Sequence, residues 1–154
     1  MFYDVFENKT VNLFIVWDEK GLKRISFSPI DIKAEKKRYN LLTEQLKAYF
    51  AGELQKFNLE IALEGSDFQQ KVWAELLKIP YGKTVTYKEI SAAINNSNAN
   101  RAVGMACNKN PIPVIIPCHR VIAQNGGLTG YAGGLKLKQK LLKLEGNNVF
   151  RGRP

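Results

Sequence analysis

The chain has 154 residues, of which 45 % are hydrophobic and 24 % charged, as in a globular protein with one compact domain or two small ones. No stretch approaches the roughly 18 uncharged apolar residues of a membrane span, and residues 1–10 lack the basic start and apolar core of a signal peptide. These features exclude an obvious membrane protein, and we expect no membrane partner.

The net charge of +9 is unevenly distributed along the chain. Residues 1–65 contain ten Lys/Arg and ten Asp/Glu, whereas residues 66–154 contain thirteen Lys/Arg and four Asp/Glu. A neutral half joined to a basic half indicates that the second half meets a polyanion such as nucleic acid. A charge bias that only favours solubility is the alternative.

The sequence contains one histidine, His119, and two cysteines, Cys107 and Cys118. These residues are too few for a usual structural zinc site, so we expect no metal. Two cysteines without a secretory signal favour free thiols in a reducing compartment, and hence a cytoplasmic protein.

The first half has the pattern of a small α/β unit. Residues 11–28 form two apolar stretches around a turn-like segment, which predicts a hairpin. Residues 39–52 carry apolar side chains at helical spacing and end at Gly52. Residues 57–63 alternate like a half-buried strand. We expect residues 1–65 to be a support domain without a catalytic cluster.

The second half is predicted to be mainly helical. Capping boxes begin two helices, at Ser66 and Gln69 and again at Thr86 and Glu89. A third helix fits residues 99–109. The second and third helices, joined by a short polar turn, predict a helix-turn-helix, although any small helical domain can contain such a pair.

The remaining segments follow the third helix. Residues 113–117 suit a brief buried strand that leads into Cys118. Residues 124–134 are a glycine-rich loop, and residues 135–146 form a last amphipathic helix ended by glycine. The predicted fold class is therefore α+β, with an α/β domain over 1–65 and a mainly helical domain over 66–154.

The contiguous Cys118 and His119 are the candidate reactive groups. A thiol attacks as its thiolate, and a nearby histidine titrates in the range that would raise the thiolate fraction. Adjacent residues often point in different directions, so a bridging water is an alternative to direct contact. The following glycine-rich loop could bring backbone N–H groups close to a ligand.

The segment "IPCHRV" at 116–121 resembles the active-site signature of the O6-alkylguanine-DNA alkyltransferases, the methylated-DNA–protein-cysteine methyltransferases. "SDFQQKVWAELLKIPYGKTVTYKEIS", "NRAVGMACNKNPIPVIIPCHRVI", "GYAGG" and "KLLKLEG" are similar to successive blocks of that family, in order and at similar spacings. The resemblance spans nearly all of 66–154, and residues 42–61 resemble the less distinctive N-terminal domain.

The resemblance implies a direct-reversal DNA repair protein. It acts on double-stranded DNA that contains O6-alkylguanine, rotates the damaged base out of the duplex, and transfers the alkyl group, mainly methyl, to a cysteine once and irreversibly. It also implies a ribonuclease H-like first domain, a winged-helix-like second domain, a monomer, and a reaction that needs no cofactor. The sequence does not rank guanine against O4-alkylthymine as the lesion.

Roles follow for residues that match the family motifs. Cys118 would be the nucleophile, His119 the base acting through a water, and Glu145 the group that orients His119. Arg101 would fill the space left by the extruded base, and Asn110 would brace the turn before the active-site segment. Small residues would let the third helix approach the minor groove: Ala102, Gly104 and Ala106. Met105 is bulkier than expected there.

The implied guanine pocket combines one hydroxyl with backbone groups. Tyr87 would donate to the purine N3 and so contact the DNA. The carbonyls of Cys118 and Val121 would accept the exocyclic amine, and the N–H of Ala132 would donate to O6. Residues Tyr131, Gly133 and Gly134 would shape the wall, and a glycine at 133 favours tolerance for O6 substituents larger than methyl.

Two other classes of function fit parts of the sequence. A DNA-binding or lesion-recognition protein without chemistry would keep the helix-turn-helix, but it would not need Cys118. A papain-type hydrolase normally has its histidine far from the cysteine in sequence, whereas here the two are adjacent.

Overall fold

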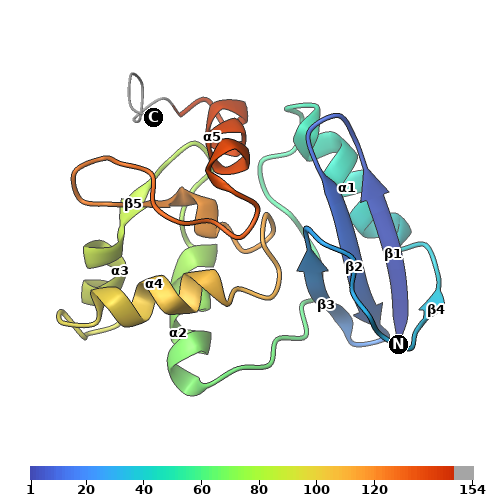
Figure 1. The fold of residues 1–154 in the computed structure, drawn as a ribbon, viewed down its shortest axis with the longest axis horizontal. Coiled ribbons are helices and arrows are strands. Elements are labelled where there is room, and N and C mark those ends of the chain that lie inside the picture. The colour runs from blue at the N-terminus through green and yellow to red at the C-terminus, as the bar shows by residue number, and fades with distance from the viewer. Residues whose placement is uncertain (148–154) are drawn as a thin grey trace. The chain divides into compact units, whose positions relative to one another are not determined.

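A computed structural model gives the structure of the protein and describes residues 1–147 (Figure 1). The chain divides into two compact units, Met1–Leu63 and the residues from Glu64 onward. Both units contain helices and strands, so the fold is mixed α and β. Within residues 1–147, none of the helices combines the length and the apolar character that crossing a bilayer requires.

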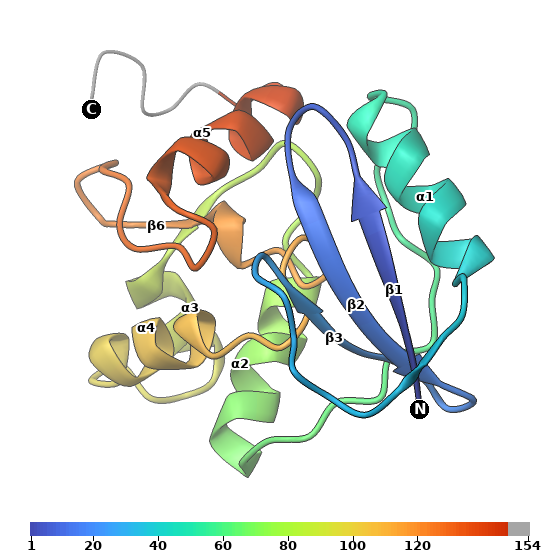
Figure 2. The ribbon, with the colours of Figure 1, turned by 45° about the vertical axis from the view of Figure 1, so that its right-hand side comes forward.

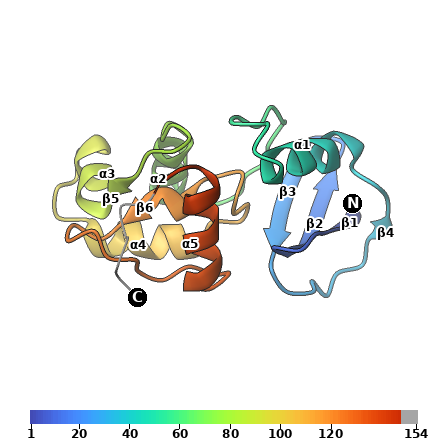
Figure 3. The same ribbon diagram turned by 90° about the horizontal axis from the view of Figure 1, so that it is seen from above.

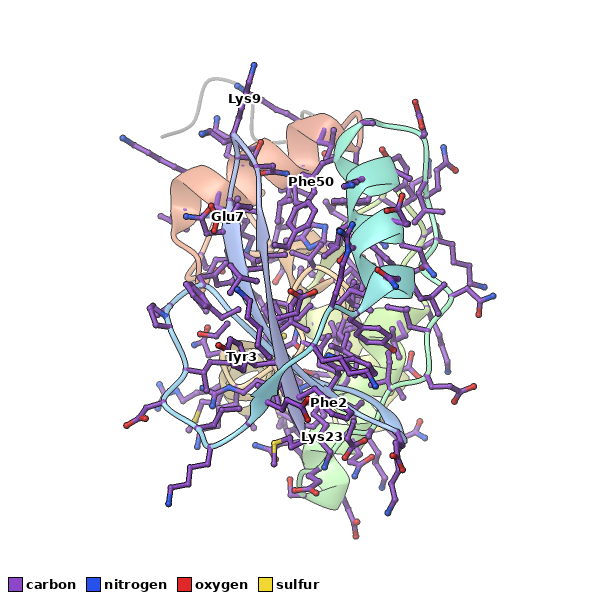
Figure 4. All side chains as sticks on the ribbon, turned by 90° about the vertical axis from the view of Figure 1, so that its right-hand side faces the viewer. Phe2, Tyr3, Glu7, Lys9, Lys23 and Phe50 are labelled. Atoms are coloured by element: carbon purple, nitrogen blue, oxygen red, sulfur yellow. The ribbon has the colours of Figure 1, made fainter. Side chains whose placement is uncertain are left out.

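The first unit is built on a four-stranded sheet of order β3-β2-β1-β4. Its strands are β1 (Phe2–Glu7), β2 (Asn12–Asp18), β3 (Gly21–Ser26) and β4 (Glu35–Lys36). The antiparallel pair of β2 and β3 confirms the hairpin predicted over residues 11–28. Strands β1 and β2 are also antiparallel, and Figure 4 shows Glu7 and Lys9 at the tip of their hairpin.

Strand β1 was not predicted from the sequence, and a carboxylate, Asp4, stands within its apolar pattern. Asp4 is nevertheless buried, and its two oxygens accept hydrogen bonds from the backbone N–H groups of Val5 and Tyr39, at 2.8 and 3.0 Å. These backbone donors replace part of the water that the carboxylate loses on burial and so offset part of its cost. Asp4 thus fastens the start of the following helix to the sheet.

Helix α1 (Asn40–Phe50) covers one face of this sheet, as Figure 3 shows. Leu42, Leu46 and Tyr49 are fully buried, which confirms the helical spacing seen in the sequence. The ring of Phe50 is directed at the strands and stacks on Phe6 with centroids 5.9 Å apart (Figure 4).

The strand predicted over residues 57–63 is wrong in extent. Only Ile61 forms a bridge, to Leu22 of β3, supported by hydrogen bonds from Leu22 N to Glu60 O and from Ala62 N to Leu22 O. The alternating pattern correctly indicated partial burial, but a single bridge against the edge of β3 does not make a strand.

The second unit contains the three predicted helices, α2 (Asp67–Leu77), α3 (Tyr87–Ala93) and α4 (Asn100–Asn108). Both predicted capping boxes are present, at Ser66 with Gln69 and at Thr86 with Glu89. Helices α3 and α4 pack against each other and form the expected helix pair, and both also pack against α2. Buried Trp73 of α2 donates from Nε1 to the carbonyl of Ala106 in α4, at 2.9 Å.

The strand predicted over residues 113–117 is absent, and the segment is a buried turn. Val114 has a positive φ of 75°, and Ile116 N donates to Ile112 O at 2.9 Å. Prolines at 111, 113 and 117 lack the N–H donors that a strand needs in order to pair. The apolar run predicted burial correctly, but the prolines decided the backbone.

The chain then forms the short 3-10 helix η1 (Cys118–Arg120) and strand β6 (Val121–Ile122), which is parallel to β5 (Val85–Thr86). After the glycine-rich loop, helix α5 (Leu135–Leu144) follows its N-cap residue Gly134 and packs against η1 (Figure 2). This packing brings the end of α5 to the predicted reactive pair.

Candidate active site

The 3-10 helix η1 holds Cys118 inside the second unit. The residue is only 7 % exposed, and its thiol is free. The preceding turn is braced by Asn110, whose Nδ2 donates to Ile116 O at 2.8 Å and whose Oδ1 accepts from Ile112 N at 2.9 Å. One amide thus fixes both ends of the segment that leads into the cysteine.

Glu145, at the C-terminal end of α5, binds His119. The His119 Nε2 lies 2.8 Å from Glu145 Oε2, and both residues are buried. A carboxylate accepts only, so Nε2 carries the proton and Nδ1 is left as the basic nitrogen. Nδ1 is buried and has no hydrogen-bond partner among the described residues. The geometry therefore provides a neutral imidazole whose free acceptor is Nδ1.

Arg120 holds the same carboxylate from its other side. Its Nε donates to Glu145 Oε1 at 2.7 Å, its second terminal nitrogen to Oε2 at 3.0 Å, and its first to the carbonyl of Ile79 at 2.7 Å. Burial raises the pKa of Glu145, but the hydrogen bonds and charges of His119 and Arg120 outweigh it and lower the pKa to about 2. The carboxylate is charged at neutral pH.

Burial dominates the titration of the two candidate reactive groups. It raises the pKa of the Cys118 thiol, while a hydrogen bond from Asn110 and the charge of Lys138 act in the opposite direction. It also lowers the pKa of His119, against the contribution of Glu145. The resting site thus favours a thiol beside a neutral imidazole, which suits proton removal during the reaction rather than a standing thiolate.

Helix α4 presents a mixed outer face. Arg101, Ala102 and Met105 are exposed, the last at 57 %. Gly104 faces α3, because a Cβ atom there would lie 3.8 Å from the Tyr87 ring. Ala106 is 2 % exposed and packs inward, so its side chain does not lie on the outer face where the sequence prediction had placed it. Helical periodicity turns position 106 toward α2, whose Trp73 binds its carbonyl.

The predicted pocket residues come from three segments of the second unit. Tyr87 is half-buried at the start of α3, and its hydroxyl lies 2.8 Å from Thr129 Oγ1 of the loop. Val121 is fully buried in β6. Tyr131 is half-buried, with burial raising its pKa well above the usual value, while Ala132 is exposed and Gly133 is partly exposed.

Two charged residues at the site were not predicted from the sequence. They are Arg120, which follows His119 in η1, and Lys138 of α5. Lys138 is fully buried. It lies three and four positions before buried Leu141 and Leu142, so its place on the apolar stripe was the available signal.

Among residues 1–147, no group of three or more His, Cys, Asp or Glu side chains could hold a metal ion. A buried cysteine followed by a histidine that a carboxylate orients is the arrangement of a cysteine nucleophile with a general base. Together with the paired helices α3 and α4, this site fits the class of cysteine-dependent group-transfer proteins.

Comparison with known proteins identifies the family. The family model described as "6-O-methylguanine DNA methyltransferase, DNA binding domain" matches residues 67–147. A methylated-DNA–protein-cysteine methyltransferase of Methanosarcina barkeri is 49 % identical over 157 residues, which cover 97 % of this chain and 99 % of that protein. The chain belongs to this methyltransferase family.

Solved structures agree with this assignment. The crystal structure of Mycobacterium tuberculosis OGT in complex with DNA has a TM-score of 0.89 and 41 % identity, and the match covers 94 % of this chain and 92 % of that one. An O6-methylguanine DNA methyltransferase from Methanococcus jannaschii has a TM-score of 0.69 and 31 % identity, with 94 % of each chain covered.

Proposed function

We propose that this protein repairs DNA by direct reversal, transferring the O6-alkyl group of guanine, mainly methyl, to Sγ of Cys118. The observation that carries the proposal is the buried Cys118, His119 and Glu145 arrangement in a chain that belongs to the methyltransferase family. O4-alkylthymine is a second candidate lesion, because its O-methyl bond can be broken by the same displacement.

The chemistry is a displacement at saturated carbon. As the S–C bond forms, the C–O6 bond breaks and its electron pair goes to the purine. The thiol proton passes to His119, through a water, and the purine takes up a proton to become guanine. The S-alkyl thioether has no easy hydrolytic route back, so each Cys118 reacts once.

The base would reach Cys118 only after leaving the duplex, because the O6 substituent is inaccessible within the base stack. Arg101 would occupy the space that it leaves, while the small, exposed Ala102 and the partly exposed Gly104 would allow close approach of α4 to the minor groove. Tyr87 would donate to N3, and the carbonyls of Cys118 and Val121 would accept the exocyclic amine. Ala132 N–H would donate to O6, beside Tyr131, Gly133 and Gly134.

We further propose a division of labour between residues 1–65, a ribonuclease H-like support domain, and residues 66–154, a winged-helix-like domain for DNA binding and alkyl transfer. The proximity of the unit boundary at Leu63 to the expected one at 65 supports this division. We also propose a monomer in the cytoplasm, and two free thiols fit such a reducing compartment.

Mass spectrometry of the protein after incubation with an O6-methylguanine duplex tests the proposal. We expect one added methyl group per molecule, on the peptide that contains Cys118. Cys118→Ala should take up none and still bind the duplex, while Cys107→Ala should react like the wild type. Sustained turnover with limiting protein, or an unchanged mass, would contradict alkyl transfer to Cys118.

A further inference from the structure

Lys138 is a buried cation in the second unit that the proposed transfer step does not use. It is fully buried in α5, whereas Lys136 and Lys140 of the same helix are exposed. An ammonium group is costly to bury unless polar groups replace its water. The hydrogen-bond partners of Lys138 therefore indicate its role in the second unit.

Two backbone carbonyls from different segments receive its hydrogen bonds. Lys138 Nζ donates to Val121 O at 2.8 Å and to Thr129 O at 2.9 Å. Val121 directly follows η1, which carries Cys118, and Thr129 belongs to the glycine-rich loop. One ammonium thus joins the two segments assigned to the walls of the guanine pocket.

The same ammonium faces titratable groups on η1 and α4. Burial lowers the pKa of Lys138 to about 8, whereas a negative charge on Cys118 or Cys107 would raise it. Burial raises the pKa of Cys107 to about 12, so that thiol stays neutral near pH 7. Burial is the main cause that lowers the pKa of His119, and the charge of Lys138 acts in the same direction.

We propose that Lys138 is a positioning residue for alkyl transfer, which aims the Val121 carbonyl, fixes the loop at Thr129 and presents a positive charge to Cys118. A carbonyl oxygen has two lone pairs, so Val121 can accept from Lys138 and from the guanine amine together. Thr129 Oγ1 lies 2.8 Å from the Tyr87 hydroxyl, which extends the same contact to Tyr87. This inference rests on the proposed function.

Single-turnover kinetics with an O6-methylguanine duplex test it. Lys138→Met keeps the length of the side chain but removes the charge and the donors, Lys138→Arg keeps both, and Lys140→Met is the matched control on the exposed side of α5. The Kd for the same duplex is measured on versions that also carry Cys118→Ala. The rate at saturating DNA is followed against pH.

Lys138→Met should transfer about 100-fold more slowly at saturation, the loss typical of a misplaced reacting group. The rise of its rate with pH should shift to higher pH, because the thiolate form of Cys118 loses the positive charge that stabilises it. The Kd for the duplex should not change. Lys138→Arg should recover most of the rate, and Lys140→Met should match the wild type.

A Lys138→Met variant that transfers at the wild-type rate would overturn the inference. So would a variant whose pH profile is unchanged and whose slower transfer is explained entirely by a weaker Kd or by a larger fraction of unfolded protein. If the Met variant does not fold, Lys138→Arg decides. The wild-type rate should fall above about pH 8, as Lys138 loses its charge, and the Arg rate should not. Identical profiles overturn the inference, whereas a wild type that accepts no methyl overturns the proposed function itself.

Discussion

Replacing Glu145 with glutamine removes the negative charge that binds His119 in the proposed active site, while nearly keeping the shape of the side chain. Glu145 holds His119 at 2.8 Å and Arg120 at 2.7 and 3.0 Å, and all three residues are buried. A neutral amide leaves the guanidinium without a counter-charge. It can also donate to His119 Nε2, which would shift the imidazole proton to Nδ1.

The loss of stability can be worked out from this geometry. Removing one partner of a buried ion pair costs about 3–5 kcal/mol. The lowered pKa of Glu145 leads to a similar value, because a change from the ordinary 4.5 to about 2 corresponds to about 3 kcal/mol. For a chain of this length, such a loss lowers Tm by about 10 °C.

The pH dependence of stability has a definite sign. The native pKa of Glu145 is lowered, so its contribution is complete above about pH 4.5 and is lost as the pH falls from there toward about 2. Glu145→Gln should therefore be less stable than the wild type at pH 7, and the difference should shrink in acid. Denaturant unfolding at a series of pH values measures this difference.

The effect on the rate should exceed the effect on folding. With the proton on Nδ1, His119 no longer offers an acceptor there, and the loss of a general base costs about 10²- to 10⁴-fold. Methyl transfer is measured well below the Tm of the variant, so that only folded protein is compared.

Glu75→Gln is the matched control. Glu75 pairs with exposed Lys78 at 2.8 Å, and such a surface pair contributes about 1 kcal/mol or less. If Glu145→Gln resembled Glu75→Gln in Tm, acid response and rate, the reasoning about the buried carboxylate would be refuted.

Three further substitutions test the other assignments. Arg101→Ala should slow transfer from duplex DNA by about 10- to 100-fold, since extrusion costs a few kcal/mol, but not transfer from free O6-benzylguanine; equal losses would contradict a role in extrusion. Gly133→Trp should block benzyl transfer and spare methyl transfer, so equal losses of both would refute the steric prediction. Asn110→Ala should lower the free energy of unfolding by about 1–3 kcal/mol and raise the pKa of Cys118, as measured by denaturation and by thiol titration. If neither quantity changed, Asn110 would not brace the turn before Cys118.

Features that depend on neighbours in sequence were predictable. Both capping boxes form at the expected residues, because an N-cap hydroxyl and the residue three positions later meet within one turn. The hairpin of β2 and β3 and the burial along α1 followed for the same reason. The resemblance around Cys118 also pointed to the family that the comparisons identify.

Features that depend on distant partners were predicted less well. Strand β1 exists because β2 and β4 pair with it, and Asp4 is tolerated there only because Val5 and Tyr39 supply donors. The strand expected over 113–117 failed for a local reason, since its prolines outweighed an apolar pattern that describes burial but not backbone conformation.

The amino-acid sequence alone determined which chemical groups this protein carries, and it placed Cys118 beside His119 through a peptide bond. The family resemblance already implied that Glu145, 26 positions away, orients His119, and the tertiary structure brings the two side chains together. Only the tertiary structure decided that Arg120 binds the same carboxylate and that Lys138 is buried. The reason is that a charged side chain has no fixed environment until the chain has folded around it. Its partners and its solvation, and hence its pKa, are properties of the packed structure.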